Sequence, residues 1–517
     1  MVRRLGPVFP AILALAAALP AQRFEDRELY APGGQKYERF GSAVALDGQW
    51  GAVGHERDAD LGPESGSVWV FGVDPTATGV WQLTASDGRS GDRFGCSLAA
   101  AGGVLVAGAW SADAPQVDSG AAYVFRWDPL AGAWNEEAKL DPAASVRGDR
   151  TGEAVAVSAE VVVVGAPGND YSGAGAGLAY AWRWDPLAGS WVYEGWLWPG
   201  AGALDPDDSF GSAVAVSGDV AAIGAFGDDD LGSAAGAVWV FRFVPGFNYW
   251  SLETKLTAGG GAAGDLFGWS LALDGDTLAV GAPGANGRTG EVFVFRYDPV
   301  NRIWNQEAVL VDPAGAADDQ FGRSVALSGD LLAAGAPGAD EGGQDHGTAL
   351  WFERAPATGQ WLEQGRVLDS SPKLSEQQGE RIALLGDALL VAAPNDRDQA
   401  LGAGSAALVR HLRMRLFPQP SPPVAGQPLV VDLVGAEPLS PAWLAYSLDG
   451  PGSYGVPQLG VALNLATPRQ AGPMLVTDPV GNASWLFTVP AAMAGRQAWA
   501  QALQRGGKSE RISVVIQ

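Results

Sequence analysis

Pairs and triplets of carboxylates recur along this chain, and they are the side chains best suited to chemistry. They stand at Asp58 and Asp60, at Asp228, Asp229 and Asp230, at Asp340 and Glu341, and at Asp396 and Asp398. Adjacent carboxylates repel one another unless a cation or water lies between them, and Ca²⁺ needs several carboxylate oxygens that converge on one loop. Asp228, Asp229 and Asp230 are therefore the candidate metal ligands. The alternative interpretation is that all these acids are solvated loop residues.

Other catalytic chemistry has little support in the sequence. Cys96 is the single cysteine, and the three histidines, His55, His346 and His411, lie far apart. Thiolate or imidazole metal sites and Cys–His nucleophile pairs are thus disfavoured. The Gly-rich segment 258–265 lacks the following lysine and the strand-to-helix context of a phosphate-binding loop. The sequence predicts no catalytic residue and no cofactor apart from the candidate Ca²⁺.

The composition favours an all-β fold and disfavours nucleic acid as a partner. The chain has 33 basic and 58 acidic residues, and its net charge of -25 would repel a phosphate backbone. The 72 glycines and 34 prolines, with 18% charged residues, indicate many short elements and many turns. A chain of 517 residues is too long for one ordinary core unless repeats each add a layer.

The first 21 residues have the pattern of a secretory signal peptide. Arg3 and Arg4 precede an apolar run over residues 8–19, and small residues follow. Cleavage is expected after Ala18 or Ala21. The run is too short to span a membrane and no second one follows, so we expect a secreted or cell-surface protein without a transmembrane segment. An exported protein without disulfides suggests a bacterial source.

An internal repeat provides the frame for the acidic segments. Phe-Gly pairs begin at residues 40, 94, 210, 267 and 321, and degenerate versions begin at Thr151 and Gln378. These seven starts are 54 to 59 residues apart, yet a Gly-Ala-Pro-like motif always begins 14 residues after the Phe position. A constant core with variable connections is expected of a recurring supersecondary unit.

Each unit is predicted to contain four strands. The first, such as residues 324–328, has small residues and ends in a two-residue turn. The second is continuously apolar, the third, such as 291–298, mixes aromatic residues with valine, and the fourth, such as 304–311, is the most polar. This gradient describes a wedge that is narrow at an axis and exposed at its rim. Such wedges form a β-propeller when arranged radially.

The seventh unit has only three strands, and its fourth strand is predicted at the N-terminus. After residues 405–412 the chain runs into prolines. Leu29 precedes Phe40 by 11 residues, the offset that also separates Leu83 from Phe94. The strand around Leu29 is therefore in register to complete the last blade and close the ring. The alternative, an open solenoid, would leave a bare sheet edge at each end.

The combination of Phe-Gly with Gly-Ala-Pro, intact at residues 165–167, 281–283 and 335–337, resembles the FG-GAP repeat. That repeat is known from the seven-bladed propeller of integrin α chains and from secreted bacterial proteins. The resemblance covers about residues 23–415 and implies a seven-bladed propeller. Integrin-like repeats typically hold Ca²⁺ between strands one and two, but here that connection is a two-residue turn in every unit, so those ligands cannot be carried over.

The tripeptide Arg147-Gly148-Asp149 has the sequence that animal cell-adhesion receptors recognise. Asp149 stands two residues before a repeat start, and Asp92 and Asp265 stand at the same place in other units, each after a glycine. The Gly-Asp pair is thus part of the repeat, and we expect no adhesion ligand here.

The long connections and the tryptophans indicate where recognition is expected. Antiparallel strands place the strand two–three and four–one connections on the same side, and these connections are long, variable and acidic, so this side is the predicted binding surface. Six of the 20 tryptophans recur at the start of strand four, which indicates packing: Trp81, Trp134, Trp191, Trp250, Trp304 and Trp361. Trp184, Trp196 and Trp198 are less regular and are candidates for an exposed patch in the third blade.

The sequence thus predicts a signal peptide over residues 1–21, a propeller over 22–415, a Pro-rich linker over 416–428 and a small C-terminal β-sandwich over 429–517. The expected function is that of an exported, non-catalytic binding or adhesion protein that recognises a protein or a glycan. The alternatives are an extracellular hydrolase acting on polysaccharide through dispersed carboxylates, and a structural component of the cell envelope.

Overall fold

The chain folds into two compact units, one of residues Gln22–Leu412 and one of Arg413–Gln517 with Met1–Ala21. The computed structural model describes residues 21–24, 27–31, 36–73, 79–114, 116–340, 344–356, 358–368, 375–397 and 399–409, and after residue 414 the strands alone. The predicted signal peptide lies outside the described residues except for Ala21. Among the described residues no helix is long and apolar enough to cross a membrane.

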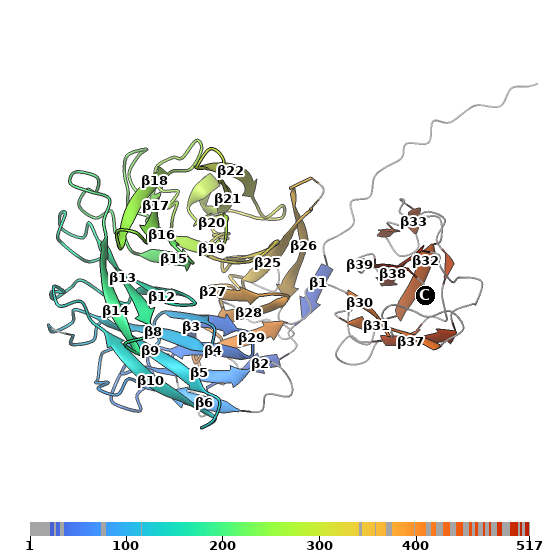
Figure 1. Ribbon diagram of the computed structural model, residues 1–517, viewed down its shortest axis with the longest axis horizontal. Helices are drawn as coiled ribbons and strands as arrows, with labels where there is room; N and C mark the ends of the chain where they lie inside the picture. The colour runs from blue at the N-terminus through green and yellow to red at the C-terminus, as the bar shows by residue number, and fades with distance from the viewer. Residues whose placement is uncertain are drawn as a thin grey trace, which may run out of the picture. The chain divides into compact units, whose positions relative to one another are not determined.

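The larger unit is a ring of seven antiparallel sheets around a common axis (Figure 1). Blade 1 contains β3 (Phe40–Asp47), β4 (Trp50–His55), β5 (Ser67–Gly72) and β6 (Val80–Leu83). Blade 2 contains β7 (Leu98–Ala101), β8 (Val104–Ala109), β9 (Ala121–Asp128) and β10 (Ala133–Leu140), and blade 3 contains β11 (Ala154–Ser158), β12 (Val161–Ala166), β13 (Leu178–Asp185) and β14 (Ser190–Leu197).

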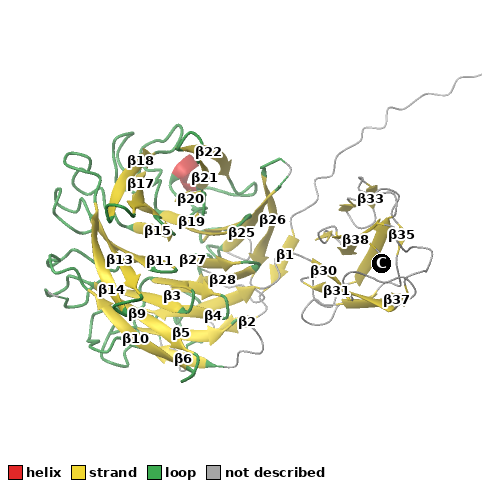
Figure 2. Ribbon diagram, in the orientation of Figure 1, coloured by secondary structure: helices red, strands yellow, loops and turns green. Residues whose placement is uncertain are grey.

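The remaining blades repeat this order. Blade 4 contains β15 (Ala213–Ser217), β16 (Val220–Ala225), β17 (Ala237–Val244) and β18 (Tyr249–Leu256), and blade 5 contains β19 (Ser270–Asp274), β20 (Thr277–Ala282), β21 (Glu291–Asp298) and β22 (Ile303–Leu310). Blade 6 contains β23 (Ser324–Ser328), β24 (Leu331–Ala336), β25 (Thr348–Arg354) and β26 (Trp361–Leu368), and blade 7 contains β27 (Arg381–Leu385), β28 (Ala388–Ala393) and β29 (Ser405–Val409). The short α1 (Ala285–Arg288) is a single turn between β20 and β21 (Figure 2).

The burial of the strands follows the gradient predicted from the sequence. The second strand, for example β12, is buried at every position, because neighbouring blades cover both of its faces. The fourth strand, for example β22, is exposed at four of its eight positions, including its first. The predicted seven-bladed propeller is confirmed.

The N-terminal strand closes the ring. β2 (Arg27–Leu29) pairs with β29, and Leu29 lies opposite Ala406. Leu29 is 9% exposed and packs in one apolar cluster with Phe40 and Leu408. The prediction of closure is confirmed and the open solenoid is excluded. An addition that the sequence did not indicate is β1 (Ala21–Phe24), which lies beside β26 as a fifth strand of blade 6.

The Phe-Gly pair is the joint between successive blades. The Phe267 ring is fully buried, and its backbone N–H donates to the Ala235 carbonyl of the preceding blade at 3.0 Å. The same bond closes the ring, from Phe40 N–H to the Ala403 carbonyl at 2.8 Å. Gly236 ends the loop that meets Phe267 and has φ +86°, and a Cβ there would lie 2.1 Å from the Phe267 oxygen. The repeat consensus is therefore fixed by backbone contacts.

The smaller unit is also built of strands. One sheet contains β30 (Arg415–Gln419), β31 (Pro428–Val434) and β37 (Ala483–Thr488). A second contains β32 (Pro441–Ser447), β35 (Arg469–Gln470), β36 (Leu475–Val476), β38 (Gln497–Gln504), β39 (Gly507–Lys508) and β40 (Ile512–Val515), and β33 (Tyr454–Val456) pairs with β34 (Val461–Leu463). The sandwich arrangement stays a prediction.

Regular structure begins earlier here than the predicted linker over residues 416–428 implied. Strand β30 lies largely within that segment and pairs with β31. Pro418 is accommodated because β30 is at the edge of its sheet, where a residue without an N–H can be tolerated.

Candidate functional site

The strand two–three and four–one connections lie on one side of the ring, which we call the loop face. Each strand two–three loop is closed by a backbone bond from its last glycine to the carbonyl of its third residue. Gly236 donates to Asp228 at 2.9 Å and Gly66 donates to Asp58 at 3.0 Å. The carboxylates of these two aspartates also accept backbone N–H groups two residues further on. Such Asx turns fix the loop, so the first aspartate in each of these two loops has a structural role.

The Lys255 ammonium lies between two of the three acids that the sequence offered as candidate Ca²⁺ ligands. Its Nζ lies 2.5 Å from Asp228 Oδ2 and 2.6 Å from Asp230 Oδ2, whereas Asp229 is exposed. Burial of the ammonium works against its charge, but the two carboxylates outweigh this effect and raise the pKa of Lys255. No group of three or more His, Cys, Asp or Glu side chains in the described part of the chain is arranged to hold a metal ion. Asp228 and Asp230 are thus joined in an ion pair with Lys255, and the Ca²⁺ site stays a prediction.

The acidic pair in blade 1 is held in a similar way. Asp58 accepts from Ser67 and, at 3.0 Å, from Gln82 Nε2, which also donates to Asp60 at 2.8 Å. Burial alone would raise the pKa of Asp58, but the contact with His55 and the bonds from Ser67 and the Asp60 N–H lower it to about 2. Asp58 is thus ionised and paired at neutral pH.

The other two predicted pairs are only partly described. Asp340 accepts the Asp345 N–H at 2.9 Å and Asp396 is buried, whereas Glu341 and Asp398 lie outside the described residues.

The aspartate of the Arg147-Gly148-Asp149 tripeptide is unavailable for recognition. Asp149 is 1% exposed, and its Oδ2 accepts from the Val146 N–H at 2.8 Å and from Asn169 Nδ2 at 3.0 Å. In other units the equivalent aspartate also accepts the backbone N–H three residues before it, as Asp319 accepts that of Ala316. In five units such an aspartate stabilises the turn before the repeat start, and the buried Asp149 cannot serve in an adhesion signal.

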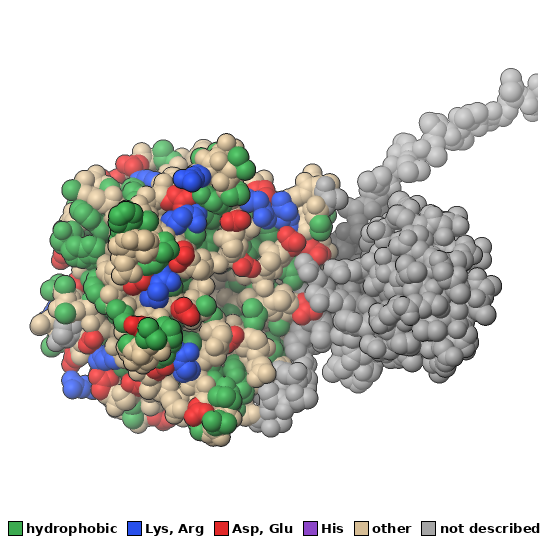
Figure 3. Space-filling model, in the orientation of Figure 1, with side chains coloured by type: hydrophobic (Ala, Val, Ile, Leu, Met, Phe, Trp, Pro, Cys, Tyr) green, Lys and Arg blue, Asp and Glu red, His purple; other side chains and the backbone are tan. Residues whose placement is uncertain are grey.

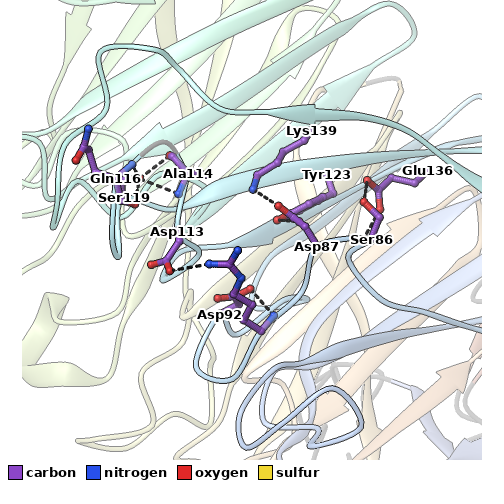
Figure 4. Close-up of polar contacts among 11 residues, drawn as sticks. Ser86, Asp87, Asp92, Asp113, Ala114, Gln116, Ser119, Tyr123, Glu136 and Lys139 are labelled. Atoms are coloured by element: carbon purple, nitrogen blue, oxygen red, sulfur yellow. Dashed lines mark hydrogen bonds and ion pairs between the residues drawn. The ribbon is translucent and has the colours of Figure 1, made fainter.

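The four–one connection between blades 1 and 2 shows how firmly the loop face is tied down (Figure 4). Asp87 accepts from Tyr123 Oη at 2.8 Å and from Lys139 Nζ at 2.7 Å. Ser86 is bonded to Glu136 of β10 through both its N–H and its hydroxyl, at 2.8 and 2.7 Å. The connection is therefore fixed to the outer strands of blade 2 by side chains as well as by backbone.

A pocket of about 280 Å³ lies within the ring of first strands, and we call it the axial pocket. Residues from β3, β7, β11, β15, β19, β23 and β27 or just before them line it, so every blade contributes to its wall. Around the centre of the disc, acidic and basic side chains are interspersed (Figure 3). Because these first strands begin at the loop face, the residue after each Phe-Gly lies at that end of the wall.

One side of the pocket combines an arginine cluster with aromatic rings. Arg323 Nη2 lies 3.1 Å from Glu380 Oε1, and Arg381 Nη1 lies 3.2 Å from the same oxygen. The Arg323 guanidinium lies 4.3 Å from the centroid of Trp269, and Trp269 contacts Phe226 at 4.7 Å between centroids. Burial opposes ionisation of Glu380, but Arg381 and Arg323 outweigh it and lower its pKa.

Arginine–glutamate pairs of the same kind lie in or just before blades 1 and 3. Arg150 Nε lies 2.6 Å from Glu153 Oε2, and the Arg150 guanidinium lies 5.3 Å from the Trp110 centroid. Arg39 Nη1 lies 2.9 Å from Glu56 Oε1. Burial raises the pKa of Glu153. Burial also raises the pKa of Cys96 to about 12, so the thiol is protonated at neutral pH and is a poor nucleophile.

The mouth of the pocket is nearly neutral although the chain is strongly acidic. The charged residues that line it are Arg323, Arg381 and Glu153, which leaves one positive charge, against -25 for the whole chain. Ion-paired arginines, aromatic faces and serine hydroxyls can bind a polar ligand by hydrogen bonds and stacking.

The sequence pattern did not single out these residues, because they follow the Phe-Gly pair and share its place in the repeat. A column-by-column comparison of the repeats would have found this position, since it holds five residue types in seven units, and five of its residues line the pocket: Cys96, Glu153, Ser212, Trp269 and Arg323.

The predicted aromatic patch of blade 3 divides into two parts. Trp184 packs against Trp191 at 5.6 Å and lies under Arg126 at 4.5 Å, so it is not part of a patch with the others. Trp196 is 44% exposed, and its ring contacts Tyr171 at 4.9 Å. Trp184 lies at the opposite end of the blade because β13 and β14 pair it with Trp191, near their connecting turn.

Comparison with solved structures gives only distant likenesses. Sqt1 of Saccharomyces cerevisiae is 12% identical with a TM-score of 0.38, over 76% of this chain and 98% of that one. A candidate 6-phosphogluconolactonase of Bacteroides fragilis is 13% identical with a TM-score of 0.41, over 64% and 85%. A Lactobacillus plantarum protein is 11% identical with a TM-score of 0.42, over 64% and 86%. Comparison with curated proteins found no match.

The family comparison is more specific. The sequence profile described as FG-GAP repeat matches residues 24–71, 78–125, 134–182, 201–241, 250–295 and 304–352. Together these six segments span more than half of the 517 residues, and they agree with the recurring joints and blades described above. The chain therefore belongs to the FG-GAP repeat family.

Proposed function

We propose that this chain is a non-catalytic binding protein that recognises an extracellular protein or glycan through its loop face, with the axial pocket as the centre of recognition. The observation that carries the proposal is the contrast between framework and pocket. The Phe-Gly joint recurs around the ring, whereas the residue that follows it changes from unit to unit and in five units lines a pocket of about 280 Å³. Variable side chains on a fixed frame are a common basis of recognition.

The chemistry of the mouth supports binding. Glu153, which lines the pocket, is held by Arg150 at 2.6 Å, and the lining residue Arg323 is held by Glu380 at 3.1 Å, so these pairs are preorganised donors and acceptors. Preorganisation reduces the entropy lost when a ligand is bound. Trp269 and Phe226 provide apolar faces in the same pocket.

The proposed place of action is outside the cell or at its surface, in a bacterium. The support is the sequence of the first 21 residues, with two arginines, an apolar run and small residues before Gln22.

One observation favours hydrolysis as a second candidate. Glu153 lines the axial pocket and burial raises its pKa, as is common for a general acid. A glycan that is bound and then cleaved by the wild type, but not by Glu153→Gln, would support this alternative.

The test is a screen of the full chain from Gln22 against glycan and extracellular-protein arrays. Arg381→Ala and Trp269→Ala should weaken binding of any ligand found by about tenfold or more, equivalent to about 1.4 kcal/mol. Leu187→Ala is the control, because Leu187 is 99% exposed in the turn after β13, on the opposite side of the ring. Absence of any ligand, or equal affinity for all three variants, would contradict the proposal.

A further inference from the structure

A polar side chain near the end of the fourth strand holds the loop-face acids in four blades, and we call this contact the outer latch. Its members are Gln82 with Asp58 and Asp60, Lys139 with Asp87, Lys255 with Asp228 and Asp230, and Arg366 with Asp312. All four latch residues occupy the same register, opposite the third residue of the third strand.

Blade 3 replaces the latch with an aromatic contact. Trp196 occupies the latch register, opposite Tyr180. Tyr171 occupies the loop position of Asp60 and Asp230, since it follows Asn169 as these aspartates follow Asp58 and Asp228. The two rings lie 4.9 Å apart between centroids. An ion pair in blade 4 thus corresponds to a Tyr–Trp pair in blade 3.

The exposure of this pair exceeds what holding the loop requires. Tyr171 is 56% exposed and Trp196 is 44% exposed. The loop is already tied to the outer edge, because Trp198 Nε1 donates to Ser172 Oγ at 2.8 Å and the Trp198 ring contacts Tyr171 at 5.4 Å. Exposed aromatic rings that packing does not need point to a binding surface.

A third ring extends the surface along β14. Tyr193 is 48% exposed and packs on Trp182 at 5.4 Å. The register shift in the β13–β14 pairing leaves Glu194 as the extra residue of β14. Tyr193 and Trp196 therefore pair with Trp182 and Tyr180, which are two residues apart on β13 and lie on one face. We call Tyr171, Tyr193 and Trp196 the rim platform.

The rim platform presents rings and hydroxyl groups but no charge of its own. The one charged residue between its strand members, Glu194, has a side chain that is 4% exposed and is paired with Arg183 at 2.6 Å. Aromatic faces stack on the apolar C–H faces of sugar rings, while hydroxyl groups of Tyr171, Tyr193 and Ser172 can exchange hydrogen bonds with sugar hydroxyls. A nucleic acid or an acidic polysaccharide would approach against a net charge of -25.

We propose that the rim platform is a binding subsite for a neutral polysaccharide, separate from the axial pocket. The proposal rests on the proposed binding function and names one ligand class for it. The rings are held on a sheet edge by Trp182, Tyr180 and Trp198, so they need no rearrangement to bind.

The test uses a variant that copies a latch from elsewhere in the ring. Tyr171→Asp with Trp196→Lys recreates in blade 3 the Asp230–Lys255 pair of blade 4, so the loop keeps a polar latch while the platform is lost. The full chain from Gln22 is measured by calorimetry against laminarin, galactomannan and xyloglucan. The swap should keep the thermal unfolding midpoint and weaken binding of the polysaccharide that the wild type binds by about tenfold or more.

The control is Phe247→Ala, which removes a ring that is 78% exposed in the β17–β18 turn and should leave affinity unchanged. Equal binding by the swap and the wild type would overturn the rim platform. So would the failure of all three neutral polysaccharides, or binding of single-stranded DNA that the swap abolishes. Binding of a protein or another glycan sensitive to Arg381→Ala would still support the axial pocket, so the two proposals fail separately.

Discussion

Removal of the Lys255 ammonium is the sharpest test of the ion pair that stands where Ca²⁺ was expected. In Lys255→Met the Asp228 carboxylate, whose side chain is 4% exposed, loses its counter-ion. Breaking a buried pair in this way costs about 3 to 5 kcal/mol. Lys255 is 20% exposed, so solvent offsets part of the loss, and we expect about 3 kcal/mol. Asp230 is 66% exposed, and Asp230→Ala should cost no more than about 1 kcal/mol.

The assay is urea unfolding followed by tryptophan fluorescence at neutral pH. Asp228→Asn combined with Lys255→Met removes both charges and should recover most of the lost stability, because no unpaired charge stays buried. Because the pKa of Lys255 is higher in the folded state than in the unfolded state, its charge stabilises the fold fully at every pH below the unfolded-state pKa, near 10.5. This stabilisation is lost as pH rises through the folded-state pKa. The difference between wild type and Lys255→Met should therefore be constant from about pH 6 to 9 and shrink above about 10.5.

Calcium supplies the refuting arm of the same experiment. Millimolar Ca²⁺ should leave the wild-type midpoint unchanged, because the ammonium occupies the space between the carboxylates, and should raise the midpoint of Lys255→Met by partly replacing that charge. A wild-type midpoint that rises with Ca²⁺, or a Lys255→Met variant no less stable than Asp230→Ala, would refute the reasoning.

Three further perturbations test the framework by unfolding midpoints. Burial raises the pKa of Asp208 from 3.8 to about 6, so the wild type loses stability as pH rises through that range and the carboxyl ionises. Asp208→Asn should therefore be more stable than the wild type by about 2 kcal/mol at pH 7, and equally stable below about pH 4. Leu29→Asp should cost about 3 kcal/mol or more, because it would place a charge at a site that is 9% exposed and weaken the packing of β2 that closes the ring. Gly236→Ala should destabilise strongly, since its Cβ would lie 2.1 Å from a backbone oxygen, whereas Gly260→Ala, at φ +88° with nothing within 4 Å, should cost only about 1 kcal/mol.

The blade order and the closure could be predicted because each depends on positions that the repeat makes comparable. The 11-residue offset between Leu29 and Phe40 predicts β2, since that spacing recurs wherever a fourth strand leads into the next unit. The pairing of β1 with β26 could not be predicted in this way, because Ala21–Phe24 has no counterpart in the other units.

The functional side chains were harder to place because their partners are distant in sequence. The sequence left Asp228 and Asp230 as candidate Ca²⁺ ligands or solvated loop residues, whereas their counter-ion comes from Lys255 on the outer strand. Aligning the fourth strands would have revealed the recurring latch residue. Trp184 lies near the end of β13, and Trp196 lies near the end of β14, so the antiparallel pairing places the two residues at opposite ends of the blade. Composition cannot show this separation.

The two proposed binding surfaces occur where the propeller constrains a side chain least. The Phe-Gly joint and the loop glycines meet backbone atoms at close range, so substitution there costs stability and the residues recur. In five units the residue after Phe-Gly lines the axial pocket, where its type is less constrained by backbone contacts. At the outer latch, replacing both members of a buried ion pair together costs far less than removing one of them, and an aromatic pair contributes about 0.5 to 1.5 kcal/mol of its own. Blade 3 can therefore exchange Asp and Lys for Tyr171 and Trp196 with little change in stability, and the exchange alters only the surface that a ligand meets.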